Sequence, residues 1–118
     1  MNLLELKPFI PAKDFKLSKK FYLDIGFTLE GCNNQLAHFS FQKKGFLLQN
    51  FYNKELASNM VLHLLVDDAH LWWKKWKNNK IDTTYNVLLS EPENQPWGMC
   101  DFTLHDPSGI LWRISHSI

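Results

Sequence analysis

The chain carries one order of predicted elements twice. In each half an apolar stretch leads to an aspartate, Asp14 in the first half and Asp68 in the second, and an amphipathic segment follows it. An aspartate in this place can accept a hydrogen bond from a free N–H group in the first turn of a helix. Apolar stretches separated by turn residues then follow in both halves. The pattern predicts β-α-β-β-β twice, with an offset of 54 residues between positions 14 and 68.

The first half begins with a strand that is expected at a sheet edge, because Pro8 and Pro11 cannot donate hydrogen bonds to a central ladder. The helix that follows is predicted to end at Gly26, a residue that adopts the left-handed conformation easily. The predicted elements are a strand at 4–12, a helix at 14–26 and strands at 27–35, 36–45 and 46–52.

The second half repeats this order with one addition. Its predicted elements are a strand at 60–68, a helix at 69–79, a strand at 80–87 and a hairpin of strands at 99–109 and 110–117. The helix has an apolar face made of Ala69, Trp72, Trp73 and Trp76. The extra segment, VLLSEPENQPW at 87–97, is interpreted as a long loop that borders a site.

Superposing the halves places Phe39 on Phe102 and Gly45 on Gly109, with one residue inserted in the second hairpin turn. The turn DPSG, residues 106–109, has Asp, Pro and Gly at its first, second and fourth positions, which is typical of a type I turn. Trp112 alternates with its neighbours in a way that points it toward the helix, so we predict that it is a core residue.

Together these features resemble the vicinal oxygen chelate superfamily, which includes glyoxalase I, extradiol dioxygenases and bleomycin resistance proteins. The likeness rests on FYLDIGF at the end of the first helix and on PWGMCDFTLHDPSG and DPSGILWRI in the last hairpin. The resemblance is strongest to the bleomycin-resistance-like branch. It implies an α+β fold in which two tandem βαβββ modules, about 1–54 and 58–118 of one domain 1–118, form curled mixed sheets around a cleft. It also implies a homodimer in which each cleft takes a module from each subunit.

Metal-dependent members of the superfamily bind a divalent ion with residues of the first and last strand of each module. The corresponding positions here are Lys7, Val61, Gln49 and Arg113. Two cations, one aliphatic side chain and one amide are a poor donor set for such an ion. We therefore expect no metal and no cofactor.

Side chains alternate between the two faces of a strand, so the strands also predict which residues line the cleft. The predicted ligand-binding residues are His38, Gln49, Phe51, His63, Trp97, Asp101 and Arg113. Apolar and aromatic walls with a few polar groups are typical of a small-molecule pocket. Lys7 and Arg113 would make this pocket locally basic, which favours a neutral or anionic aromatic ligand.

The predicted function is metal-independent binding of a small organic molecule by a homodimer, with sequestration of a toxin or antibiotic as one form. No catalytic residue is assigned. The alternative is a lyase, isomerase or dioxygenase-type enzyme of the same superfamily with a non-standard site, for example through His38 and His63. A third hypothesis is an interaction module without a ligand.

The composition of the chain indicates which kinds of partner and which cellular compartment to expect. The net charge is +1 and the lysines are scattered, so a nucleic-acid surface is not expected. No apolar run approaches the roughly 20 residues that span a bilayer, and no secretion signal is visible. Cys32 and Cys100 lack metal-binding spacing and are expected to be reduced thiols, so a cytoplasmic location is predicted.

Overall fold

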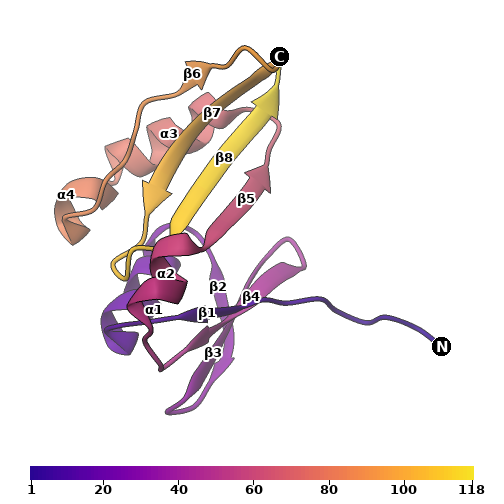
Figure 1. Cartoon of the computed structure of the whole chain (residues 1–118), viewed down its shortest axis with the longest axis vertical. Coiled ribbons are helices and arrows are strands. Elements are labelled where there is room, and N and C mark those ends of the chain that lie inside the picture. Colours follow the sequence, from indigo (N-terminus) through magenta and orange to yellow (C-terminus); the bar gives the residue numbers. More distant parts are fainter.

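The computed structural model describes the whole chain, Met1–Ile118, and contains two four-stranded sheets (Figure 1). The first sheet has the strand order β1-β4-β3-β2, with β1 parallel to β4 and the other pairs antiparallel. One helix, α1, packs on one face of this sheet. The elements are β1 (Phe9–Pro11), α1 (Phe15–Asp24), β2 (Thr28–Cys32), β3 (Leu36–Phe41) and β4 (Lys44–Gln49).

The second sheet repeats this plan with the order β5-β8-β7-β6, and α3 packs on one face of it. A short helix, α2 (Lys54–Asn59), joins the two halves. The remaining elements are β5 (Val61–Leu65), α3 (Ala69–Asn78), α4 (Ile81–Tyr85), β6 (Glu93–Asn94), β7 (Met99–His105) and β8 (Leu111–Ser117). The predicted α+β fold of two βαβββ-like modules is confirmed. No helix of the chain has both the length and the apolar character needed to cross a membrane.

Both predicted helix caps are present. The side chain of Asp14 accepts a hydrogen bond from the N–H of Leu17, and that of Asp68 accepts one from the N–H of His70. Gly26 follows α1 with φ +115°, a conformation that L side chains rarely adopt. Sequence signals within a few residues therefore set where each module's main helix begins, and Gly26 sets where α1 ends.

One continuous core joins the two modules on the helix-bearing faces of the sheets. Trp112 of β8 is 2% exposed, as predicted for a core residue. Its ring centroid lies 5.7 Å from that of Tyr22, 5.6 Å from that of Phe27 and 5.5 Å from that of Phe46. The indole N–H of Trp76 in α3 donates to the carbonyl of Ile25 at 2.9 Å. Residues of the second module thus complete the core of the first.

A buried hydrogen-bond network anchors the β7–β8 turn on α1. The hydroxyl of Tyr22 donates to Asp106 Oδ2 at 2.5 Å and accepts from the indole N–H of Trp112 at 3.0 Å. Asp106 Oδ1 accepts from the N–H groups of Ser108 and Ile110, and the N–H of Gly109 donates to the carbonyl of Asp106. This bonding confirms the predicted tight turn at DPSG.

The predicted strand at 80–87 is wrong, because residues Ile81–Tyr85 form the helix α4. Ile81 and Tyr85 are both buried, and their spacing of four residues places them on one face of a helix as well as on one face of a strand. The fourth strand of the second sheet is instead β6, two residues within the segment that was interpreted as a loop.

The superposition of the two hairpins is also wrong, by two residues. Phe9 lies opposite Leu47 in the first sheet, and His63, which is 54 residues after Phe9, lies opposite Arg113 in the second. Leu47 is therefore the counterpart of Arg113, and by the same register Gln49 is the counterpart of Ser115. A shift of two keeps every side chain on its own face, so alternation alone does not reveal it.

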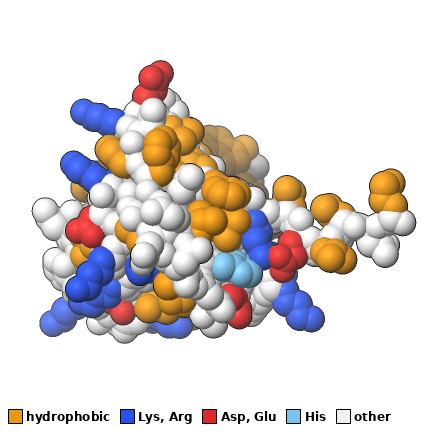
Figure 2. Space-filling model, turned by 90° about the horizontal axis from the view of Figure 1, so that it is seen from below, with side chains coloured by type: hydrophobic (Ala, Val, Ile, Leu, Met, Phe, Trp, Pro, Cys, Tyr) orange, Lys and Arg blue, Asp and Glu red, His pale blue; other side chains and the backbone are white.

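Apolar side chains remain exposed on the sheet faces turned away from α1 and α3, which we call the open faces. Val61 and Leu65 of β5 are 56% and 66% exposed, whereas Leu62 and Leu64 pack against the core. Residues 1–6 stand out from the body as an arm with exposed leucines (Figures 1 and 2).

Candidate functional site

The open face of the second sheet carries a connected polar group. Arg113 on β8 donates to Asp101 on β7 at 3.2 Å, and the side-chain amide of Gln95 donates to the other carboxylate oxygen at 3.0 Å. Asp101 is only 4% exposed, so both oxygens of a nearly buried carboxylate are satisfied. His63 lies opposite Arg113 in the β5–β8 ladder. The structure therefore brings together three predicted residues: His63, Asp101 and Arg113.

The open face of the first sheet holds the remaining predicted strand residues. His38 lies on β3 opposite Leu47, and its Nε2 atom is buried without a hydrogen-bond partner. Gln49 ends β4, and Phe51 follows it with an exposed ring. No hydrogen bond or ion pair joins His38, Gln49 or Phe51 to the group on the second sheet. Within one chain the predicted residues therefore form two half-sites on separate sheets.

Trp97 lies outside both half-sites, in the tight turn before β7. The N–H of Gly98, whose φ is +84°, donates to the carbonyl of Gln95, and the N–H of Ile118 donates to the carbonyl of Gly98. Trp97 is 66% exposed and forms no ring contact within the chain. An exposed indole on a braced turn is available to a ligand or to another protein surface.

Three polar residues of the open faces were missed from the sequence. Gln95 belongs to the segment interpreted as a loop, so its contact with Asp101 had no local signal. Glu5 forms an ion pair with Lys7, which lowers the pKa of Glu5 below its ordinary value. His105 on β7 has a buried Nδ1 atom without a hydrogen-bond partner. Alternation along β7 from Asp101 could have placed His105 on the open face.

The residues at the metal positions that the resemblance implies do not fit a divalent ion. Lys7 pairs with Glu5 and Arg113 pairs with Asp101, while Val61 offers no donor atom. Gln49 could offer a carbonyl oxygen, but the register of the sheets makes Leu47 the counterpart of Arg113, and Leu47 has no donor atom. No three His, Cys, Asp or Glu side chains of the chain are arranged to hold a metal ion. These positions therefore lack a donor set for a divalent ion.

The expected basic character of the open faces is neutralised by pairing. Glu5 and Asp101 balance Lys7 and Arg113, the two cations on which that expectation depended. A further carboxylate, that of Glu30 on β2, accepts a hydrogen bond from the hydroxyl of Ser40 at 2.5 Å. The preference for an anionic ligand at this site therefore has no support from the charges.

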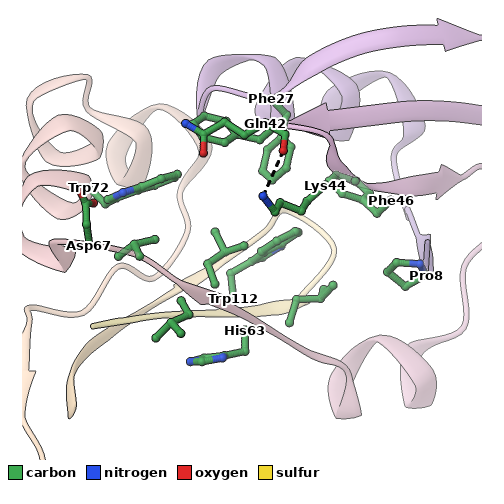
Figure 3. Close-up of a pocket in the computed structure, with 15 residues that line it drawn as sticks. Pro8, Phe27, Gln42, Lys44, Phe46, His63, Asp67, Trp72 and Trp112 are labelled. Atoms are coloured by element: carbon green, nitrogen blue, oxygen red, sulfur yellow. Dashed lines mark hydrogen bonds between the residues drawn. The ribbon is translucent and has the colours of Figure 1, made fainter. Parts of the chain in front are cut away.

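The main hollow of the chain lies elsewhere, between the two modules beside the free edge of β5 (Figure 3). Its volume is about 560 Å³, and we call it the seam groove. Of the predicted ligand-binding residues, only His63 lines it. The residues that line it are Pro8, Phe27, Phe41, Gln42, Lys44, Gly45, Phe46, Leu62, His63, Leu64, Leu65, Val66, Asp67, Trp72 and Trp112.

Comparison with solved structures identifies close structural neighbours over the whole chain. A bleomycin-binding protein complexed with bleomycin has a TM-score of 0.80 at 24% identity, with 97% of this chain and 98% of that chain covered. An antibiotic-binding protein from Streptomyces sp. CB03234 has a TM-score of 0.77 at 18% identity, with 100% and 99% covered. Lactoylglutathione lyase from Agrobacterium tumefaciens has a TM-score of 0.70 at 15% identity, with 98% and 95% covered.

No protein-family model and no curated protein matches the sequence. The likeness therefore lies in the arrangement of the elements, which extends over both modules and both sheets. At these identities it establishes the fold and leaves the ligand and the chemistry to be argued from the residues. The chain has the fold of solved bleomycin-binding, lactoylglutathione lyase and glyoxalase/bleomycin resistance/dioxygenase proteins.

Proposed function

We propose that the protein binds a small organic molecule without a metal, in clefts that two copies of the chain complete by facing their open sheet faces toward each other. The observation that carries the proposal is the ordered group Gln95–Asp101–Arg113 beside His63, on an open face that also exposes the apolar side chains of Val61 and Leu65. A few fixed polar groups among apolar walls orient a ligand. Sequestration of an antibiotic or toxin is consistent with the neighbours described as bleomycin-binding and antibiotic-binding proteins.

Exposed apolar surface supports the second copy. Phe9, Val61 and Leu65 stand on the open faces, and the leucines of the arm are also exposed. Surfaces of this kind in soluble proteins commonly mark contacts with another chain. A second copy facing the first would also bring the half-site with His38, Gln49 and Phe51 to the half-site with His63, Asp101 and Arg113. Trp97 would then border the completed cleft.

The ligand that suits this cleft is neutral and aromatic, because its cations are already paired. Arg113 uses one N–H group for Asp101, and its remaining N–H groups can still donate to a carbonyl group. Trp97 and Phe51 offer rings for stacking. This set supports binding and includes no assigned catalytic group.

Ligand titration tests the proposal. Purified protein is titrated with bleomycin and with neutral aromatic antibiotics while tryptophan emission and native mass are recorded. We expect saturable binding of one ligand per chain, weakened at least tenfold by Arg113→Ala, because a lost hydrogen bond to a charged donor costs about 1.5–3 kcal/mol. Lys74→Ala, on the outer face of α3, should change nothing. Equal affinity of Arg113→Ala and wild type would contradict the site.

Oligomeric state tests the second part of the proposal. Sedimentation should show a dimer, and Leu65→Glu should convert it to a monomer by placing a charge on the open face. Leu71→Glu is the matched control, because Leu71 is equally exposed but lies on α3. If the wild type is a monomer at all concentrations, the proposal that two copies complete the cleft is contradicted.

A further inference from the structure

The seam groove is separate from the Gln95–Asp101–Arg113 group, because none of these three residues lines it. Its walls are residues of the helix-bearing side, with the ring centroids of Phe41 and Trp72 at 5.2 Å, and Trp112 contributes to its lining. A second, smaller hollow of about 250 Å³ shares Phe41 and Trp72 with it. The β5 edge adds His63 and Leu65, but neither Asp101 nor Arg113 reaches the groove.

The groove lies beside a place where the two modules differ, the ends of their hairpins. The β7–β8 connection is longer, residues 106–110, and docks on α1, with Ser18 Oγ 3.4 Å from Ser108 Oγ. The β3–β4 turn contains only Gln42 and Lys43, whose φ values are +50° and +68°. Both residues are left-handed, as in the tight type I′ turn of a regular hairpin.

The helices differ at the matching position as well. Ser18 of α1 and Trp72 of α3 correspond through the 54-residue offset between the modules. Ser18 is small and lets the β7–β8 turn approach α1, whereas Trp72 forms a broad apolar wall. The tight β3–β4 hairpin touches this wall through Phe41, and the space beside that contact stays open.

One cation projects into this aromatic space. Lys44 lies on the same face of β4 as the core residues Phe46 and Leu48, and its ammonium group points into the groove (Figure 3). Lys44 Nζ donates to the carbonyl of Gln42 at 3.3 Å and belongs to none of the chain's three ion pairs. The one carboxylate of the lining, Asp67, lies at the Trp72 end and accepts from the N–H of Asp68.

We propose that the seam groove is a second ligand site, which takes a flat aromatic molecule with one terminal acid group. The rings lie against Trp72 and Phe41, and the acid group binds Lys44. A volume of about 560 Å³ is within the range of roughly 300–1,000 Å³ that holds small organic ligands. Asp67 repels a second acid group at the other end. The charge preference is opposite to that of the open faces, where every cation is paired.

Two fluorescent probes that differ by one sulfonate test this assignment. 8-Anilinonaphthalene-1-sulfonate is the anionic probe, and N-phenyl-1-naphthylamine is its uncharged analogue. We expect saturable 1:1 binding of the anionic probe to the full chain, and a loss of about tenfold in its affinity in Lys44→Ala, the scale of a charge-assisted hydrogen bond. The affinity of the uncharged probe should stay the same. Lys43→Asn removes an equal charge one residue away, at a left-handed position that Asn tolerates, and should affect neither probe.

Two further variants locate the site. Val66→Phe fills the groove from the β5 side and should weaken both probes, with folding checked by circular dichroism. Arg113→Ala should weaken neither, which separates this site from the open-face cleft. The proposal is overturned if Lys44→Ala and Lys43→Asn bind the anionic probe equally, or if Arg113→Ala weakens it. It is also overturned if Val66→Phe leaves both probes unaffected and instead converts a dimer to a monomer, since a second chain then fills the groove.

Discussion

Gly45 of β4 lies directly against the backbone of β3. A Cβ atom added at Gly45 would lie 2.2 Å from the carbonyl oxygen of Phe39, a contact that only a backbone shift can relieve. Gly45→Ala should therefore lower the free energy of unfolding by about 1–3 kcal/mol, the usual cost of forcing atoms into a filled space. Urea denaturation measures the effect. Gly31→Ala on β2 is the matched control, because nothing lies within 4 Å of its added Cβ, and similar losses in both variants would refute the steric explanation.

Asp106 links the stability of the fold to pH. Burial raises the pKa of Asp106 above its ordinary value, although the hydrogen bond from Tyr22 and those from the backbone oppose this shift. Burial and the nearby Asp106 also raise the pKa of Tyr22, which keeps its hydroxyl protonated as the donor. A carboxyl group whose pKa is raised on folding contributes stability below its unfolded pKa of about 3.9, and this contribution is lost as the pH rises through the folded pKa.

The prediction concerns how the free energy of unfolding depends on pH in wild type and in Asp106→Asn. The free energy of unfolding of wild type relative to this variant should fall as the pH rises from about 3 to 7, measured by urea denaturation at each pH. Asp82→Asn provides a control of opposite sign, because the hydrogen bond from Lys77 lowers the pKa of Asp82. Its contribution should be present at neutral pH and lost on acidification. Parallel pH profiles for the two variants would contradict the assignment.

At the scale of elements, the features predicted correctly from the sequence are those that nearby residues control, such as the ends of helices. Asp14, Asp68 and Gly26 act within a few residues of themselves, and each lies where a cap or a helix end was expected. The error at α4 arose because Ile81 and Tyr85 satisfy the helical and the strand period equally. Packing decides between them: Tyr85 contacts Phe21 and its hydroxyl donates to Asp24, both in α1. A partner so distant in sequence leaves no trace in the local pattern.

The site shows the same division between local and distant information. Alternation placed His63, Asp101 and Arg113 on one face, and the ladder brings them together. Two other contacts were not predicted: the pairing of Lys7 with Glu5 and the hydrogen bond from Gln95 to Asp101. They depend on the positions of the arm and of β6, which the pattern of residues does not predict. The seam groove could not be predicted from the sequence for a related reason. It lies where the ends of two otherwise similar hairpins differ. Comparing the two repeats in the sequence identifies the elements that both modules contain, and it does not predict a groove that borders a difference between them.

At the scale of the whole molecule, the two modules share a core and should unfold together. Trp112 of the second module lies against three aromatic rings of the first. All five tryptophans belong to the second half of the chain, so tryptophan emission reports on the second module, whereas far-UV circular dichroism reports on both. We expect the two urea denaturation curves of the wild type to coincide, as for a single cooperative unit.

Trp112→Leu should weaken this coupling. Loss of the indole removes ring contacts and the donor to Tyr22, at a cost of about 3 kcal/mol or more in the free energy of unfolding. We expect the emission curve and the circular dichroism curve to separate, because the second module loses the side chain by which it completes the first module's core. Trp97→Leu is the control, since Trp97 is exposed and touches no core ring. Its curves should coincide, and separated curves in the wild type would show that the shared core does not couple the modules.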